Sequence, residues 1–331
     1  MNNRDLNLHS FVLNCGFKEE DIISIKNDAS FRKYYRIKNK NLIVMDAPPE
    51  KGESIEQFRT VADIIHTFNL SAPQIISFDT KYGFMLLEDF GQTSFSNILN
   101  KDNESELYKK AVEVLIEINR QSKSKEKELS KLKSYSIDFL VNESLLFIDW
   151  YLEKRKGEMV SNDQKKEFIQ ILSDFYNNIK PQSSTLVLRD YHVDNLFFLN
   201  NQKSLKQVGL IDFQDAVIGS PLYDLASLLE DVRRPLRRNL QKKLLEIYIK
   251  AISINVQDAE QEMRFFSIQR NLKILGIFCR LSIRDKKDGY LKYLPNAVKL
   301  LRKNLQDPFF INLVNWLKQF KNHELISVSY T

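Results

Sequence analysis

The fold of this chain is decided by Arg189-Asp190-Tyr191-His192-Val193-Asp194-Asn195 and by Gly209-Leu210-Ile211-Asp212-Phe213, which follows shortly after it. An apolar, β-prone run precedes each acid, so Asp190 and Asp212 stand where strands are expected to end. This spacing suits phosphoryl transfer, in which Asp190 accepts a proton from the substrate hydroxyl while Asn195 and Asp212 hold Mg²⁺. The alternative is that these residues only form turns, which Asp and Asn favour. The paired strand context favours the phosphoryl-transfer interpretation.

Length, charge and cysteine content are those of an ordinary globular protein. The 331 residues suggest about two domains or lobes, and 43% of them are hydrophobic. No apolar run is long enough to span a bilayer and residues 1–17 lack a leader pattern, so we expect a cytoplasmic protein. The net charge of +6 comes from 49 basic and 43 acidic residues that are interspersed, which argues against a nucleic-acid partner. Cys15 and Cys279 predict two reduced thiols.

The first ninety residues alternate short β-prone runs with polar turns. Strands are expected at residues 34–37, 42–47, 75–78 and 83–88. Between them a helix is expected to begin at Ser54, with Ser54 and Gln57 as a capping pair and an apolar face at helical spacing. This pattern predicts a small mixed sheet crossed by one helix.

Beyond Ser94 the pattern becomes mostly helical. Helices are expected at residues 104–121, 168–179, 223–234, 240–252, 259–281, 296–305 and after Asp307-Pro308. A polar, glycine-containing turn at residues 89–92 marks a boundary between lobes. The sequence therefore predicts an α+β fold with a small mixed-sheet N-lobe, residues 1–91, that binds nucleotide. The larger, mainly helical C-lobe, residues 92–331, would carry catalysis and substrate binding.

Several blocks of the chain are similar to the aminoglycoside phosphotransferase and choline kinase superfamily, whose catalytic loop reads Asp, four residues, Asn, with an Ile-Asp-Phe metal motif after it. More narrowly, the chain resembles the bacterial anomeric N-acetylmuramate/N-acetylglucosamine kinases of cell-wall recycling. The blocks that carry this likeness extend over most of the chain and are residues 27–32, 44–49, 87–91, 189–195, 211–216 and 269–276.

This resemblance implies a protein-kinase-like two-lobe fold and ATP-dependent phosphorylation of a sugar's C1 hydroxyl, with ATP and Mg²⁺ as cofactors. A small-molecule sugar and a nucleotide would be the partners, and we expect neither nucleic acid nor a membrane. An anomeric hydroxyl is more acidic than an ordinary alcohol, so a carboxylate of modest basicity at Asp190 can take its proton as the new bond forms.

Two departures from the wider superfamily concern the phosphate-binding side of the site. The expected strand at residues 42–47 has no lysine, whereas a kinase usually carries one on its third strand for the α- and β-phosphates, and Asp46 cannot replace it. The loop at residues 27–32 has no glycine. A turn over the phosphates would therefore use backbone amides around Asp28 and the Ser30 hydroxyl.

The remaining nucleotide-binding candidates lie on either side of this loop and strand. Arg32 or Lys33 could supply the missing positive charge, the alternative being that both only flank an exposed strand. Glu88 to Phe90 would form the adenine hinge, where backbone groups meet the base. Glu56 could fill the helix position that normally pairs with the strand lysine, but it is more simply a surface carboxylate.

The acceptor side of the site is less sharply defined. His192 is expected to brace the catalytic loop, and Asp224 resembles the superfamily's aspartate that bonds the backbone of this loop. Side chains that could bind the sugar lie in the loop or on the segments leaving the metal strand and are Asp194, Gln214, Asp215, Asp231 and Arg233, with Glu230 as a further candidate. An arginine there could bind the carboxylate of muramate bidentately.

Two rival functions remain open at this point. On the same fold, the acceptor could be an aminoglycoside, choline or another hydroxylated metabolite, because function resides in the site and not in the fold. A nucleotide-binding regulator without turnover is the rival from another class, and it is motivated by the missing lysine and glycines. The preferred sugar, ATP or GTP as donor, the replacement for the lysine and the oligomeric state are not set by these motifs.

Overall fold

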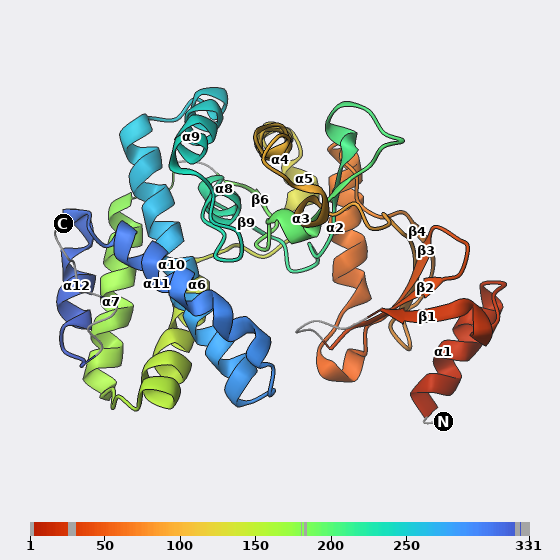
Figure 1. Cartoon of the computed structure of the whole chain (residues 1–331), viewed down its shortest axis with the longest axis horizontal. Coiled ribbons are helices and arrows are strands. Elements are labelled where there is room, and N and C mark those ends of the chain that lie inside the picture. Colours follow the sequence, from red (N-terminus) through yellow and green to blue (C-terminus); the bar gives the residue numbers. More distant parts are fainter. Residues whose placement is uncertain (1–2, 26–30, 180, 182–183, 322–324, 326–331) are drawn as a thin grey trace. The chain divides into compact units, whose positions relative to one another are not determined.

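The structure is a computed structural model that describes residues 3–25, 31–179, 181, 184–321 and 325 (Figure 1). The chain forms two compact units. The first unit comprises Met1–Glu117, Lys125–Lys131 and Asp190–Ala216, and the second comprises Ile118–Ser124, Leu132–Arg189 and Val217–Thr331. Asp190, Asn195 and Asp212 all belong to the first unit, together with the whole N-terminal sheet. The predicted lobe boundary at residue 91 stays a prediction.

The first unit is built on a five-stranded sheet with the strand order β1-β2-β3-β5-β4. Its strands are β1 Ile22–Ile25, β2 Lys33–Ile37, β3 Leu42–Asp46, β4 Ile75–Asp79 and β5 Phe84–Glu88. The four expected strands are confirmed, and β1 adds a short edge strand without the alternating pattern that would reveal it. Every pairing is antiparallel, so the sheet is more uniform than the mixed sheet that the sequence predicts.

Two helices accompany this sheet (Figure 1). Helix α1, Asn3–Asn14, packs its buried residues Leu8, Phe11 and Val12 against apolar side chains of β2, β3 and β5. Helix α2, Ile55–Thr67, begins as predicted, because the Ser54 hydroxyl accepts a hydrogen bond from the Gln57 backbone N–H. The sequence analysis did not predict α1.

A short hairpin completes the part of the first unit that contains Asn195 and Asp212. Strands β7, Leu196–Phe198, and β8, Val208–Leu210, pair antiparallel, and the helical turn Val193–Asn195 leads into β7. Strand β8 is joined to the N-terminal part of the unit, since Leu210 donates its backbone N–H to the Ser71 carbonyl at 2.8 Å. The connecting helices are α3 Phe95–Ile98, α4 Glu104–Ser122, which continues into the second unit, and α5 Glu126–Leu129.

The second unit is mainly helical around the long helix α10, Val256–Ile283. A two-stranded sheet, β6 Thr185–Val187 with β9 Val217–Gly219, and further helices belong to the same unit. These helices are α6 Ile137–Leu146, the π-helical stretch Phe147–Arg155, α7 Asn162–Ile179, α8 Leu222–Leu229, α9 Arg238–Ile252, α11 Leu294–Asn304 and α12 Ile311–Leu317. No helix in the described residues is both long and apolar enough to cross a membrane.

Most predicted helices of this unit are confirmed, with one correction. The helix expected at residues 223–234 ends at Leu229. Beyond it the Asp231 carboxylate accepts a hydrogen bond from the Arg233 backbone N–H at 3.0 Å, and Pro235 follows. A local turn of this kind competes with the helical hydrogen bonds and ends the helix. Helix α6 and its π-helical continuation were missed, because their apolar residues do not form one stripe.

Candidate active site

Asp190, Asn195 and Asp212 come together in the first unit. The Asn195 side chain donates to the Asp190 carbonyl at 2.9 Å, and its amide nitrogen lies 3.5 Å from the Asp212 carboxylate. The backbone fixes this arrangement, because Asn195 donates its N–H to the His192 carbonyl and accepts one from Ile211. The strand and loop pattern of the sequence thus places the predicted proton acceptor and both predicted metal ligands side by side.

Asp212 lies where negative charge is insufficiently compensated. Burial raises the pKa of Asp212, and the nearby charge of Asp190 raises it further, although Gln214, Arg32 and His192 act in the opposite direction. The Asp212 side chain keeps 45% of its surface accessible to solvent, so a ligand can reach the carboxylate. A divalent cation would relieve this repulsion, and carboxylate and amide oxygens suit Mg²⁺. The residues therefore fit the metal that the sequence predicts.

The backbone at Asp212 is left-handed, with φ of 58°. Among non-glycine residues, Asp tolerates this region comparatively well. Next to it, the Phe213 ring packs 4.8 Å from the Phe58 ring of α2, and Gln214 donates to the Asp212 carboxylate at 3.1 Å. The segment that follows Asp212 is thus anchored on α2, and Gln214 holds the carboxylate itself.

Arg32 reaches Asp212 from the start of β2. Its Nε lies 2.6 Å from the Glu53 carboxylate and its Nη1 lies 3.4 Å from Asp212. Burial would lower the pKa of Arg32, but its interactions with Tyr34 and with the Glu53 and Asp212 carboxylates outweigh burial and raise it. Glu53 escaped the sequence analysis because it lies in the turn before α2, where no periodicity marks it; Glu56 contacts Ser54 on the surface instead.

Of the remaining nucleotide-binding candidates, the structure describes the contacts of Glu88 and Phe90. Asp28 and Ser30 lie outside the described residues. Glu88 exchanges hydrogen bonds with the Gln74 backbone, through its own N–H at 2.9 Å and its carboxylate at 3.2 Å. The Phe90 ring packs against Gly209, where any side chain would collide, since a Cβ there would lie 2.7 Å from the ring. The side chains of Glu88 and Phe90 therefore also help to hold the first unit together.

In the second unit, two side chains hold the segment that ends at Arg189. The Asp224 carboxylate accepts the backbone N–H groups of Leu188 at 2.6 Å and Arg189 at 2.9 Å, as the sequence predicts. Arg270 donates to the Arg189 carbonyl at 2.8 Å. Arg189 itself has a φ of 72°, a costly conformation for a long side chain, and it persists because its surroundings fix it. The residue before the proposed base is therefore rigidly placed.

The Arg189 side chain ends in a buried ion cluster that the sequence analysis missed. The Glu143 carboxylate pairs with Arg189 and, at 2.7 Å, with Lys273 Nζ, and it accepts a hydrogen bond from the Tyr135 hydroxyl. Only 11% of the Glu143 and Lys273 side chains is exposed. Burial alone would raise the pKa of Glu143, but Lys273 and Arg189 hold it below its ordinary value. No sequence signal connects α6 with the middle of α10.

The predicted sugar-binding residues divide between the two units. Asp194, Gln214 and Asp215 lie in the first unit, where the Gln214 side chain bridges Asp212 and, at 3.4 Å, Asp215. Asp231 and Arg233 lie in the second unit, where the Arg233 guanidinium is 3.5 Å from the buried Asp231 carboxylate. Their roles in sugar binding stay predictions.

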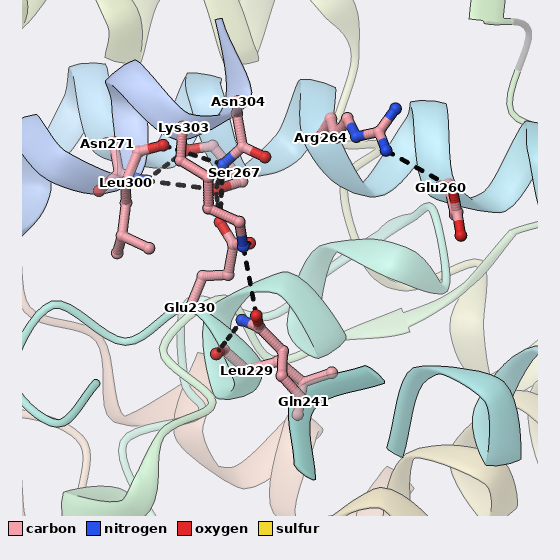
Figure 2. Close-up of polar contacts among 10 residues, drawn as sticks. All are labelled: Leu229, Glu230, Gln241, Glu260, Arg264, Ser267, Asn271, Leu300, Lys303 and Asn304. Atoms are coloured by element: carbon pink, nitrogen blue, oxygen red, sulfur yellow. Dashed lines mark hydrogen bonds and ion pairs between the residues drawn. The ribbon is translucent and has the colours of Figure 1, made fainter. Parts of the chain in front are cut away.

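Glu230, the further sugar-binding candidate, joins three helices instead (Figure 2). Its carboxylate is paired with Lys303 at 2.8 Å and accepts hydrogen bonds from Asn304 at 2.8 Å and from Ser267. Only 5% of its side chain is exposed. Gln241 extends this network by donating to the Leu229 carbonyl at 2.7 Å. Glu230 therefore connects the end of α8 with α10 and α11.

Comparison with known proteins decides the family. Residues 21–266 match the phosphotransferase enzyme family. The chain belongs to this family. This phosphotransferase is similar in sequence to N-acetylmuramate/N-acetylglucosamine kinase from Pseudomonas aeruginosa. The two are 30% identical over 85% of this chain and 82% of the relative. The kinase of the same name from Neisseria meningitidis is 29% identical over 86% of each chain.

Solved structures share the fold of this phosphotransferase at low sequence identity. The gentamicin complex of APH(2″)-IIa has a TM-score of 0.63 and 15% identity, covering 99% of this chain and 100% of that one. Choline kinase LicA from Streptococcus pneumoniae has a TM-score of 0.61 and 12% identity, covering 90% and 99%. The predicted kinase-like α+β fold is confirmed.

Proposed function

We propose that this phosphotransferase is an ATP-dependent kinase that phosphorylates the C1 hydroxyl of N-acetylmuramate and N-acetylglucosamine. The observation that carries the proposal is the convergence of Asp190, Asn195 and Asp212 in one unit, with Asn195 bonded to the Asp190 backbone and 3.5 Å from Asp212. The sugar is proposed from the relatives, which bear the name of this kinase and match most of the chain.

Asp190 is the proton acceptor in this mechanism. Its carboxylate orients the anomeric hydroxyl and takes the proton as the oxygen attacks the terminal phosphorus of ATP. The bond from this phosphorus to the β–γ bridging oxygen breaks, ADP leaves, and solvent later receives the proton. The acceptor is well matched, because an anomeric hydroxyl needs a less basic partner than an ordinary alcohol. The Asn195 side chain donates to the Asp190 carbonyl at 2.9 Å, so the backbone that carries this carboxylate is held within the first unit before the sugar arrives.

Asn195 and Asp212 are the residues that would hold Mg²⁺. The metal supplies positive charge to the phosphate oxygens when it is bound. Gln214 keeps the Asp212 carboxylate in place through its 3.1 Å hydrogen bond. Asp194, Gln214 and Asp215 are the proposed sugar-binding residues of the first unit, and the backbone of residues 88–90 is the proposed adenine hinge.

A phosphorylation assay tests the proposal. Purified protein with Mg²⁺ and ATP is offered N-acetylmuramate, N-acetylglucosamine, choline and kanamycin, and ³¹P–¹H NMR locates the phosphate on the product. We expect phosphate on C1 of the two amino sugars. Turnover of choline or kanamycin alone would establish one of the rival acceptors and overturn the sugar assignment.

The variant Asp190→Asn separates catalysis from nucleotide binding. We expect it to lose about a thousandfold or more in kcat while its ATP affinity stays within about twofold of the wild type, because only the proton acceptor is removed. ATP binding without turnover of any acceptor by the wild-type protein would support the regulator and contradict the kinase.

A further inference from the structure

The register of the sheet shows which position of β3 corresponds to the missing lysine. Val44 belongs to the apolar cluster under α1, and Asp46 pairs with Arg4 of the same helix. Side chains alternate between the two faces of a strand, so Met45 lies on the opposite face. Asp46 therefore faces α1 and is paired there with Arg4. A lysine directed to the other face of β3 would stand at position 45, which is the uncharged Met45 in this chain.

That opposite face is the one near Asp212. Met45 is the cross-strand partner of Tyr34 in the β2–β3 register, so the two side chains share a face. Arg32 lies two residues before Tyr34, so its side chain starts toward the same face, and its Nη1 lies 3.4 Å from Asp212. Arg32 therefore brings a positive charge to the face of the sheet on which Met45 lies, although it does so from the beginning of β2.

The environment of Arg32 is that of a positioned cation. Only 10% of its side chain is exposed, and a buried guanidinium is tolerated when carboxylates compensate it. Glu53 binds Nε at 2.6 Å and fixes the plane of the group, while Nη1 points toward Asp212 at 3.4 Å. A guanidinium has five donors in a planar fork, so it can bind a carboxylate along one edge and phosphate oxygens along another.

We propose that Arg32, held by Glu53, is the cation that binds the polyphosphate of the nucleotide, so that this pair takes the part played elsewhere by a strand lysine and a helix glutamate. The inference rests on the proposed function of ATP-dependent phosphotransfer. Arg32 is the binding residue and Glu53 is a positioning residue. Because Arg32 adjoins Asp212, phosphate oxygens bound to it lie beside the proposed metal ligands.

Calorimetric titration with ATP, ADP and adenosine in the presence of Mg²⁺ tests the pair without relying on turnover. Arg32→Met should weaken ATP and ADP binding roughly 10- to 100-fold and leave adenosine affinity unchanged, because the guanidinium meets only phosphate. Arg32→Lys should recover part of the loss, since charge is kept without the planar fork. Glu53→Gln should weaken ATP binding about three- to tenfold through the lost orientation of Arg32.

Lys33→Met is the matched control, because Lys33 is the neighbouring cation and is exposed at the start of β2. We expect its ATP affinity to stay within about twofold of the wild type. Circular dichroism and the melting temperature establish that each variant is folded, and Arg32→Lys serves as the second probe if Arg32→Met does not fold.

Equal ratios of ATP to adenosine affinity in the wild type and in Arg32→Lys or a folded Arg32→Met would overturn the inference, as would loss of ATP binding in Lys33→Met. Those results leave the proposed kinase intact, since the wild type still turns over. Failure of the wild type to bind ATP at all would instead remove the proposed function and this inference with it.

Discussion

Two charge clusters, one in each unit, differ in how their carboxylates are compensated. In the first unit Asp212 lies near a second carboxylate, Asp190, and shares Arg32 with Glu53, and the pKa of Asp212 is raised. In the second unit, the Glu143 carboxylate lies between two cations, Arg189 and Lys273, and its pKa is lowered. Burial acts to raise the pKa of both carboxylates, so the neighbouring charges account for the opposite directions.

This difference distinguishes a cluster that can bind a ligand from a cluster that stabilises the fold. A carboxylate whose ionised form is unfavourable gains from a cation that arrives with a ligand, whereas one already paired twice contributes to the folded state itself. The first cluster is therefore expected to lose function when its charge is removed, and the second to lose stability. Four changes test this contrast.

Asp212→Asn should have the largest effect on activity. Removal of the charge deletes a proposed metal ligand, and we expect kcat/KM to fall about a thousandfold or more. The melting temperature without Mg²⁺ should not fall, because the pKa of Asp212 is raised and its charge opposes folding. Kinetics and thermal unfolding in a metal-free buffer measure both. A variant that unfolds more readily while keeping its activity would reverse the assignment of the two clusters.

Glu143→Gln should give the largest loss of stability. It leaves Arg189 and Lys273 buried without their shared carboxylate, so we expect a loss of about 2–4 kcal/mol in the free energy of unfolding. Urea unfolding measures this loss. Because Arg189 precedes Asp190, kcat should also fall about tenfold while ATP affinity is unchanged.

Glu246→Gln is the control for this change. Glu246 pairs with Lys242 on the surface of α9, where both side chains are mostly exposed, and such pairs contribute about 0–1 kcal/mol. If Glu143→Gln loses no more free energy of unfolding than this control, the buried cluster does not stabilise the fold.

Glu262→Gln probes a third buried carboxylate, one whose described hydrogen-bond partner is the Ser220 hydroxyl. Burial raises the pKa of Glu262 to about 7 from the ordinary 4.5. The folded state thus retains a proton that the unfolded state loses, and this contribution is full below about pH 4.5 and is lost as the pH rises through 7.

The substitution should therefore become more favourable at high pH. Relative to the wild type, Glu262→Gln should gain about 2 kcal/mol in the free energy of unfolding between pH 5 and pH 8. Urea unfolding at the two pH values measures the gain. An identical pH dependence in the two proteins would show that Glu262 ionises normally, as a carboxylate with a cation beside it would.

The smallest expected effect comes from moving the cation of the first cluster. In an Arg32→Met background, Met45→Lys places an ammonium on the Tyr34 face of β3, and we expect it to restore about tenfold of the lost ATP affinity. Met45→Gln in the same background is the uncharged control. If the two double variants are folded and bind ATP equally, position 45 does not point toward the phosphates.

The sequence was sufficient for those parts of the site in which local pattern and chemistry coincide. Asp190 and Asp212 each follow a β-prone run, and Asn195 follows at a fixed distance, so their meeting could be expected. The capping pair Ser54 and Gln57 likewise predicted where α2 begins. In these cases the deciding contacts are short-range, or they follow from one hairpin.

The parts that could not be predicted depend on packing between distant segments. Glu143 and Lys273 lie on helices far apart in the sequence, and nothing in either helix marks the other as its partner. Glu53 lies in a turn, and its role depends on the side chain of Arg32. The end of α8 at Leu229 reflects the hydrogen bond that Asp231 makes to its own segment, which competes with a helical pattern that would otherwise continue.

A single glycine on α10, Gly276, allows the close helix contact on which the Lys273–Glu143 ion pair depends. A Cβ at Gly276 would lie 2.3 Å from the Leu146 carbonyl group, so even alanine would force α10 away from the end of α6. Lys273 and Glu143 each lie three residues, about one turn, before this crossing point. Because Gly276 has no side chain, α10 can approach α6 closely enough for Lys273 to reach Glu143. Any redesign of this helix therefore has to keep glycine at position 276.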